Sequence, residues 1–104
     1  MPDIKPLQED DFSEEALKRV NRMAVLFESP WCQGCHAIEK MILGLTGTEA
    51  QDCQWGKVDV SQHQGVAQRF GVLSLPTLLV FRDGQLKERM TGKISREKLL
   101  EAIK

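Results

Sequence analysis

The chain has 104 residues, a length that suits one domain able to bury somewhat over ~60% of the surface its unfolded form exposes. Its formal net charge is −1 with 28% charged residues, which indicates neither a nucleic-acid-binding surface nor a polybasic membrane patch. No apolar run approaches the ~20 residues that span a bilayer, and residues 1–6 lack the features of a secretion signal. We therefore expect one cytoplasmic domain, residues 1–104, that binds no nucleic acid and no membrane.

The first part of the chain predicts a helix, a buried strand and a second helix. Asp-Phe-Ser-Glu at positions 11–14 is typical of a capping box and predicts a short helix to about Asn21. Residues 23–29 contain a continuous apolar run, as in a central strand covered on both faces, and Pro30 ends it. A longer amphipathic helix is expected to begin near Cys32.

The second part predicts a strand over residues 54–60 and a short helix over 66–71 that a glycine stops. A hairpin follows over 77–91, with a type I or I′ turn at 82–85, and Ser95 caps a terminal helix. A parallel β-α-β half followed by an antiparallel hairpin gives an α/β fold. Its four-stranded mixed sheet would be flanked by helices on both faces.

Cys32 and Cys35 carry the strongest chemical signal, because two thiols three positions apart at a helix start can close into a disulfide and reopen. Positions i and i+3 share a helix face, and their Cα separation falls within the roughly 4.4–6.8 Å that a disulfide requires. Unpaired amides and the helix dipole stabilise a thiolate there, so we expect the pKa of Cys32 to drop from about 8.5 toward about 7 or below. Cys32 would be the nucleophile and Cys35 the shielded resolving thiol.

From about residue 12 to residue 104 the chain resembles the thioredoxin family. Trp-Cys-x-x-Cys follows the first predicted strand, Leu75-Pro76-Thr77 opens the hairpin, and further residues fall where thioredoxins place the same ones without an insertion. The residues that match are Phe12, Phe27, Trp31, Cys32, Cys35, Lys57, Pro76, Thr77, Phe81, Gly84 and Gly92. The resemblance implies the thioredoxin fold in a monomer without cofactor or metal. It also implies reduction of disulfides in protein substrates, with a thioredoxin reductase or equivalent electron donor restoring the dithiol.

The resemblance further implies an apolar substrate-binding rim around the dithiol. Its members would be Trp31, Val60, Leu75, Pro76 and Gly92. We expect a cis peptide bond before Pro76, which would set the backbone groups of Leu75 beside the thiols. An extended substrate segment could then pair with them by strand addition.

The chain departs from the family pattern on its first long strand and inside the active-site motif. Leu26 stands where family members usually carry a buried carboxylate that manages the proton of the deeper cysteine. Glu28 lies on the same side of the strand, and our hypothesis is that Glu28 and Lys57 partly replace the missing proton relay. Gln33-Gly34 replaces the common Gly-Pro, which predicts a somewhat more oxidising bridge because a residue preorganised for the first helical turn is lost.

Other interpretations of the same residues remain open. Cys-Gln-Gly-Cys-His ending at His36 also satisfies the pattern of haem c attachment, and the two thiols with His36 or His63 could in principle bind zinc. The Ser-Pro-Trp-Cys sequence is similar to the Ala-Pro-Trp-Cys of protein disulfide isomerases, so an oxidase or isomerase on the same fold is the alternative function. Cys53 is expected to be a small buried apolar residue, with a regulatory thiol or an intermolecular bridge as the alternatives.

Overall fold

A mixed sheet forms the centre of the computed structural model, which describes residues 3–45 and 47–104. Its strand order is β1-β3-β2-β4-β5, with β1, β3 and β2 parallel and β4 and β5 antiparallel to their neighbours. The strands are β1 (Ile4–Pro6), β2 (Arg22–Glu28), β3 (Gln54–Asp59), β4 (Thr77–Arg82) and β5 (Gln85–Thr91). The helices are η1 (Glu9–Phe12, a 3-10 helix), α1 (Glu14–Lys18), α2 (Gln33–Leu43), α3 (Thr48–Asp52), α4 (Gln64–Arg69) and α5 (Arg96–Ala102).

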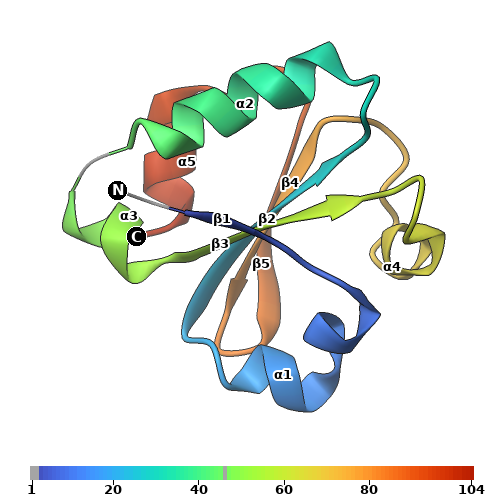
Figure 1. The fold of residues 1–104 in the computed structure, drawn as a ribbon. Helices are drawn as coiled ribbons and strands as arrows, with labels where there is room; N and C mark the ends of the chain where they lie inside the picture. The colour runs from blue at the N-terminus through green and yellow to red at the C-terminus, as the bar shows by residue number, and fades with distance from the viewer. Residues whose placement is uncertain (1–2, 46) are drawn as a thin grey trace.

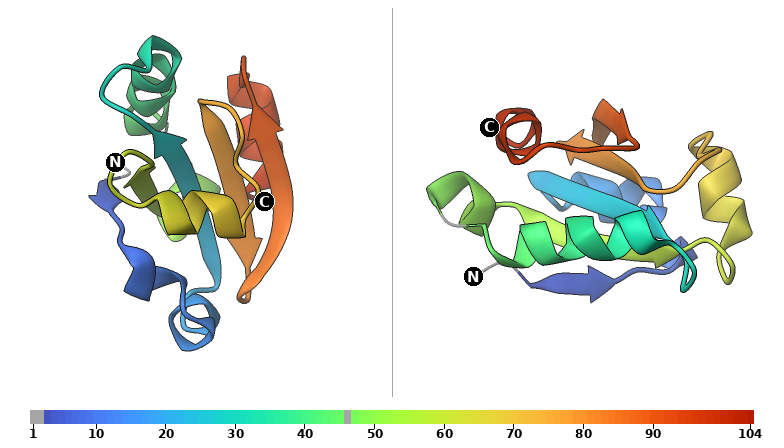
Figure 2. Two further views of the ribbon diagram at one scale, coloured as in Figure 1. Left: turned by 90° about the vertical axis from the view of Figure 1, so that its right-hand side faces the viewer. Right: turned by 90° about the horizontal axis from the view of Figure 1, so that it is seen from above.

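Helices cover both faces of this sheet (Figure 1), with α2, α3 and α5 on one side and η1, α1 and α4 on the other. Figure 2 shows β1 and β5 at the two edges and β2 in the middle. The buried side chains form two clusters, one on each face. The α/β fold with helices on both faces is therefore confirmed.

Strand β2 separates the two clusters by the alternation of its side chains. Ala24 and Leu26 pack into the cluster under α2 and α5, whereas Met23, Val25 and Phe27 pack into the cluster under η1, α1 and α4. All five side chains are buried. A continuously apolar strand arises because successive residues point to opposite faces and both faces are covered.

The sheet has five strands, and the prediction of four was wrong. The additional strand β1 pairs parallel with β3, with Ile4 opposite Trp55 and Pro6 opposite Lys57. It has three residues, and two of them are exposed, so its sequence shows no apolar alternation that would signal a strand. A proline fits there because an edge strand has one side without a neighbour.

The beginning of the chain also differs in detail from the prediction. Asp11 belongs to η1, where its carboxylate accepts a hydrogen bond from the Gln8 amide at 2.8 Å. Ser13 is the N-cap of the separate helix α1, which ends at Lys18, before the predicted Asn21. Acidic residues between positions 9 and 15 thus lie in the first turns of two short helices, η1 and α1.

Helix α3 is an element that the sequence pattern did not predict. Its five residues are too few for an apolar stripe of period 3.6 to be recognised. The Trp55 indole N–H at the start of β3 donates to the carbonyl of Ala50, in the middle of α3, at 2.9 Å.

The remaining elements match the prediction closely. Asp83 and Gly84 have φ values of 52° and 84°, so the hairpin turn is type I′. The Ser95 hydroxyl accepts from the Lys98 amide at 3.1 Å and caps α5. Leu99 and Ile103 of this last segment are buried in the same cluster as α2.

Candidate active site

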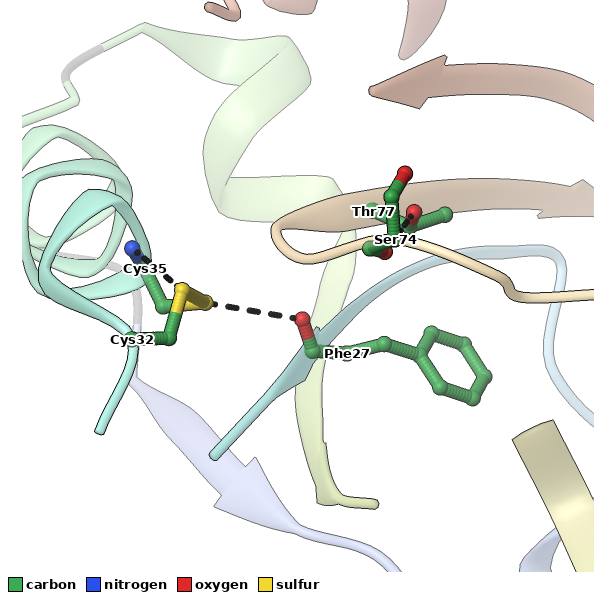
Figure 3. Close-up of a disulfide and its surroundings, with 5 residues drawn as sticks. All are labelled: Phe27, Cys32, Cys35, Ser74 and Thr77. Atoms are coloured by element: carbon green, nitrogen blue, oxygen red, sulfur yellow. Dashed lines mark hydrogen bonds between the residues drawn. A yellow bond between two sulfur atoms is a disulfide. The ribbon is translucent and has the colours of Figure 1, made fainter. Parts of the chain in front are cut away.

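The two cysteines of the motif form a disulfide at the N-terminus of α2 (Figure 3). Their Cα atoms are 5.3 Å apart, which confirms the predicted bridge between positions i and i+3. Cys32 is the N-cap of α2, and its sulfur accepts a hydrogen bond from the Cys35 amide at 3.1 Å. When the bridge opens, this amide and the positive end of the helix dipole stabilise a negative charge on the Cys32 sulfur.

The two sulfur atoms differ in their access to solvent. Cys35 is fully buried, while Cys32 is partly exposed. The Cys35 sulfur lies 3.7 Å from the backbone carbonyl oxygen of Phe27 on β2, as Figure 3 shows. Of the two sulfur atoms, that of Cys32 is therefore the more accessible from outside the protein.

The loop before β4 and the residue after β5 meet beside the dithiol. The peptide bond between Leu75 and Pro76 is cis, as predicted. A Cβ atom at Gly34 would lie 3.3 Å from Pro76 Cδ, so the proline ring packs against the first turn of α2. The Pro76 carbonyl accepts a hydrogen bond from the Gly92 amide at 3.2 Å. The fold thus brings Gly34, Pro76 and Gly92 together, although they are far apart in the sequence.

Two large apolar side chains near the site are exposed. Trp31 is 78% exposed directly before Cys32, and Leu73 is 97% exposed in the loop that leads to Pro76. The sequence analysis did not include Leu73 among the substrate-binding residues. Its place in the loop shortly before Leu-Pro-Thr could have indicated an exposed apolar side chain near the site. Val60 and Leu75 are partly buried against the cluster under α4. The Val60 amide donates to the Glu28 carbonyl at 2.9 Å, which holds Val60 at the carboxyl end of β2.

No ionisable group occupies the interior position on β2, because Leu26 is fully buried in the apolar cluster. Charge appears two residues further on, at the edge of the core. The Lys57 ammonium lies 3.0 Å from a Glu39 carboxylate oxygen and 4.0 Å from a Glu28 carboxylate oxygen. The side chains of Glu28, Glu39 and Lys57 are 17%, 23% and 29% exposed. Glu39 is a further member of this group that the sequence analysis missed.

The surroundings of Glu28 and Lys57 shift the pKa values of both groups. Burial raises the pKa of Glu28, and the neighbouring charge of Glu39 raises it further, while the charges of Lys57 and His36 act in the opposite direction. The hydrogen bond to Glu39 raises the pKa of Lys57, so the ammonium form is favoured. The Glu28 carboxyl group consequently resists ionisation more than an ordinary glutamate does.

Cys53 stands apart from the dithiol. It is a free, buried cysteine, and burial raises the pKa of its thiol to about 11. Its sulfur donates weakly to the Gln54 carbonyl at 3.5 Å. The thiol is therefore protonated at neutral pH and behaves as a small apolar side chain.

The two histidines lie on different elements, His36 on α2 and His63 at the N-cap of α4. His36 is exposed on α2, and His63 pairs with Glu9 at 2.9 Å. Within residues 3–45 and 47–104, no three His, Cys, Asp or Glu side chains are grouped so that they could hold a metal ion. No helix in the described part of the chain has the length and apolar character needed to cross a membrane.

Comparison with known proteins agrees with this geometry. The family model named Thioredoxin matches residues 3–104. The thioredoxin of Bacillus subtilis is 35% identical over 77 residues, which cover 74% of this chain and 74% of that protein. The solved thioredoxin of Malassezia sympodialis superposes with a TM-score of 0.80 at 25% identity, covering 99% of this chain and 90% of the other.

A plant relative is longer than this chain. The chain is 26% identical to chloroplastic thioredoxin M4 of Arabidopsis thaliana over 97% of its own length, and it spans 52% of that protein. The match to the family model extends over nearly every residue, and the bridge at the start of α2 supplies the reactive pair. The chain therefore belongs to the thioredoxin family and is a thiol–disulfide oxidoreductase that reduces protein disulfides.

Proposed function

We propose that Cys32 is the attacking thiolate and Cys35 the resolving thiol in the reduction of disulfides of other proteins. Cys32 attacks one sulfur of the substrate disulfide, a mixed disulfide forms, and the other substrate sulfur leaves as a thiol. Cys35 then loses its proton and attacks Cys32, which releases the second substrate thiol and leaves the bridge seen in this structure. The observation that carries this assignment is the contrast between a partly exposed Cys32 and a fully buried Cys35.

The substrate would lie across the rim formed by Trp31, Val60, Leu75, Pro76 and Gly92. Exposed apolar surface of this kind binds extended or unfolded segments weakly and broadly. Among the described residues, the amide and carbonyl of Leu75 have no hydrogen-bond partner, so they are free to pair with a substrate strand. Leu73, exposed in the loop before Pro76, is a further apolar side chain that a substrate could contact.

The oxidised protein needs an electron donor, and we propose a thioredoxin reductase or equivalent electron donor acting on a monomer in the cytoplasm. The relatives that support this proposal are bacterial thioredoxins that match most of the chain. The donor would approach the same partly exposed Cys32 sulfur, because Cys35 is out of reach.

An insulin-reduction assay tests the assignment. With dithiothreitol as donor, the native chain should accelerate insulin precipitation, and Cys32→Ser should abolish the acceleration. Cys35→Ser should instead accumulate a mixed disulfide with the substrate, because the first step remains and the second is lost. A mixed disulfide that formed on Cys35 in the Cys32→Ser variant, at the native rate, would reverse the two roles.

The electron donor is tested separately. Turnover with a thioredoxin reductase in place of dithiothreitol would support the proposal that the chain acts as a reductant. Failure with every reductase, together with a high redox potential, would favour the oxidase or isomerase alternative.

A further inference from the structure

The resolving step requires an acceptor for the Cys35 proton, and the apolar core offers none. Apart from cysteine, Thr77 is the one polar residue that is buried among residues 3–45, 47–48 and 50–104. The Phe27 carbonyl oxygen, 3.7 Å from the Cys35 sulfur, does not take up a proton. Partly buried ionisable groups on α2 and on the neighbouring strands are therefore the candidate acceptors.

Glu28, Glu39 and Lys57, which we call the Glu-Lys-Glu cluster, lie at that place. Glu28 follows directly after Phe27 on β2, and Glu39 lies one helical turn after Cys35 on the same face of α2. Lys57 comes from β3 and stands between the two carboxylates, at 3.0 Å from Glu39 and 4.0 Å from Glu28. Three elements, β2, α2 and β3, thus each contribute one charged side chain to the cluster.

An open cavity of about 800 Å³ gives the cluster contact with solvent. Besides the three cluster members, the ionisable groups that line it are His36, Lys40 and Asp59. Asp59 is occupied by hydrogen bonds from the Ser61 amide and hydroxyl at 2.9 and 2.6 Å. His63 lines a second cavity together with Glu28 and Lys57, and its ring pairs with Glu9. A proton received by Glu28 can pass to solvent through the open cavity of about 800 Å³.

We propose that the Glu-Lys-Glu cluster works as one unit in which Glu28 accepts the proton of the Cys35 thiol, while Glu39 and Lys57 position and tune Glu28. Cys35 gives its proton to the Glu28 carboxylate, the resulting thiolate attacks Cys32, and the Cys32–substrate bond breaks as the Cys32–Cys35 bond forms. The proton then passes to the departing substrate thiolate or to solvent. This inference rests on the assignment of Cys35 as the resolving thiol.

The cluster is arranged to raise the basicity of Glu28. Burial and the neighbouring Glu39 raise the pKa of Glu28, and Lys57 limits that rise. A carboxylate with a raised pKa takes a thiol proton more readily at neutral pH than an ordinary glutamate. Removal of Glu39 should therefore lower the pKa of Glu28, and removal of Lys57 should raise it.

Stopped-flow reaction of the reduced chain with one equivalent of 5,5′-dithiobis(2-nitrobenzoate) separates the two steps. Cys32 attacks the reagent and releases the first coloured thiolate. Cys35 then attacks the mixed disulfide on Cys32 and releases the second. The coloured thiolate needs no proton in order to leave. The rate of the second phase against pH thus reports the loss of the Cys35 proton. Glu28→Gln should slow the second phase by roughly 10²-fold, at the lower end of what a positioned acid–base group contributes, and remove its acid limb.

The two tuning residues should have opposite effects. Glu39→Gln should move the acid limb of the second phase to lower pH, and Lys57→Met should move it to higher pH. If Glu39 and Lys57 had a merely structural role, the acid limb would shift in neither variant, or it would shift in the same direction in both. Glu101→Gln, which removes an exposed carboxylate on α5, is the matched control and should leave both phases unchanged.

Each outcome bears on one claim. The role of the cluster would be overturned if the pH profile of the second phase were unchanged in Glu28→Gln. It would also be overturned if the acid limb moved in the same direction in Glu39→Gln and in Lys57→Met. A missing first phase in the native chain would instead overturn the proposed function itself. Should Glu28→Gln fail to fold, the opposed shifts of the other two variants still decide the matter.

Discussion

The three cysteines of this chain differ in what surrounds their sulfur atoms. Cys32 is partly exposed, and its sulfur accepts a hydrogen bond from a backbone amide. Cys35 is buried next to it, and Cys53 is buried among apolar side chains near the start of β3. Thiol reactivity follows the thiolate fraction and access, so one residue type has three roles in one domain.

Cys53 is therefore expected to be inert in the folded protein. Its pKa of about 11 means that little thiolate is present at neutral pH, and burial blocks access. Alkylation of the reduced, folded chain with iodoacetamide at pH 7 should modify Cys32 rapidly and Cys53 only after unfolding in guanidinium chloride, as read by mass spectrometry. Rapid labelling of Cys53 in the native state would contradict its buried placement.

Glu28 should make stability depend on pH in a direction opposite to that of most carboxylates. Its folded-state pKa is raised above the ordinary value of 4.5, so the folded state holds the proton more tightly than the unfolded state. Its contribution is then lost as pH rises from about 4.5 through the raised pKa. Glu28→Gln should raise Tm at pH 7 and flatten the Tm profile from pH 4 to 8, with Glu101→Gln as the control. A lower Tm at pH 7 would show that the ion pair with Lys57 outweighs the burial of charge.

At the scale of elements, α2 combines a chemical and a structural task. Its first turn carries the dithiol, and its buried face, Cys35, Ile38 and Ile42, anchors that turn to the core. The first turn contains Gly34, whose backbone freedom is greater than that of the proline common in the family.

The dipeptide Gln33-Gly34 is expected to make the bridge more oxidising than the roughly −270 mV typical of thioredoxin. Equilibration with glutathione at known ratios measures the potential. Gly34→Pro, which restricts the first helical turn, should move the potential to a more negative value, whereas the exposed glycine change Gly65→Ala on α4 should not. A native potential at or below the family value would refute the expectation.

The edge strand β1 continues into Leu7, which packs onto β3 where a glycine leaves room for it. A Cβ atom at Gly56 would lie 2.7 Å from Leu7 Cγ, so any larger residue must displace the Leu7 side chain. Gly56→Ala should lower the free energy of unfolding by about 1–3 kcal/mol in a urea titration. Gly65→Ala meets no atom within 4 Å and should be neutral or stabilising by up to about 1 kcal/mol. Equal stability of the two variants would mean that Leu7 moves aside without cost.

At the scale of the whole molecule, the sheet brings distant segments to one end. The carboxyl end of β2, the loop before β4 and the residue after β5 meet at the N-terminus of α2. Both faces of the sheet are covered, and the Cα radius of gyration is 12.4 Å, as expected for a compact domain of this length.

We expect the chain to remain a monomer, because its own helices cover both faces of the sheet. Light scattering after gel filtration should give a mass near 11.8 kDa in both redox states. The exposed side chains of Trp31 and Leu73 are the surface that could cause association. A dimer that dissociates on Leu73→Ser would contradict the expectation and identify this surface as its interface.

The amino-acid sequence by itself determined the features that short-range patterns encode. The buried strand around Leu26, the helix start at Cys32, the hairpin turn at Asp83 and the cap at Ser95 each depend on residues a few positions apart. The reactive pair was predictable for the same reason, since a spacing of three on a helix already sets the distance between two thiols.

Only the tertiary structure decided the features that depend on residues distant in the chain. Strand β1 exists because β3 offers it a free edge, and the two strands are about 50 residues apart in the sequence. Glu39 became part of the Glu-Lys-Glu cluster because the fold places Lys57 beside it, 18 positions away in sequence. Such contacts leave no periodic signal, since the burial and charge of each partner depend on where another element packs.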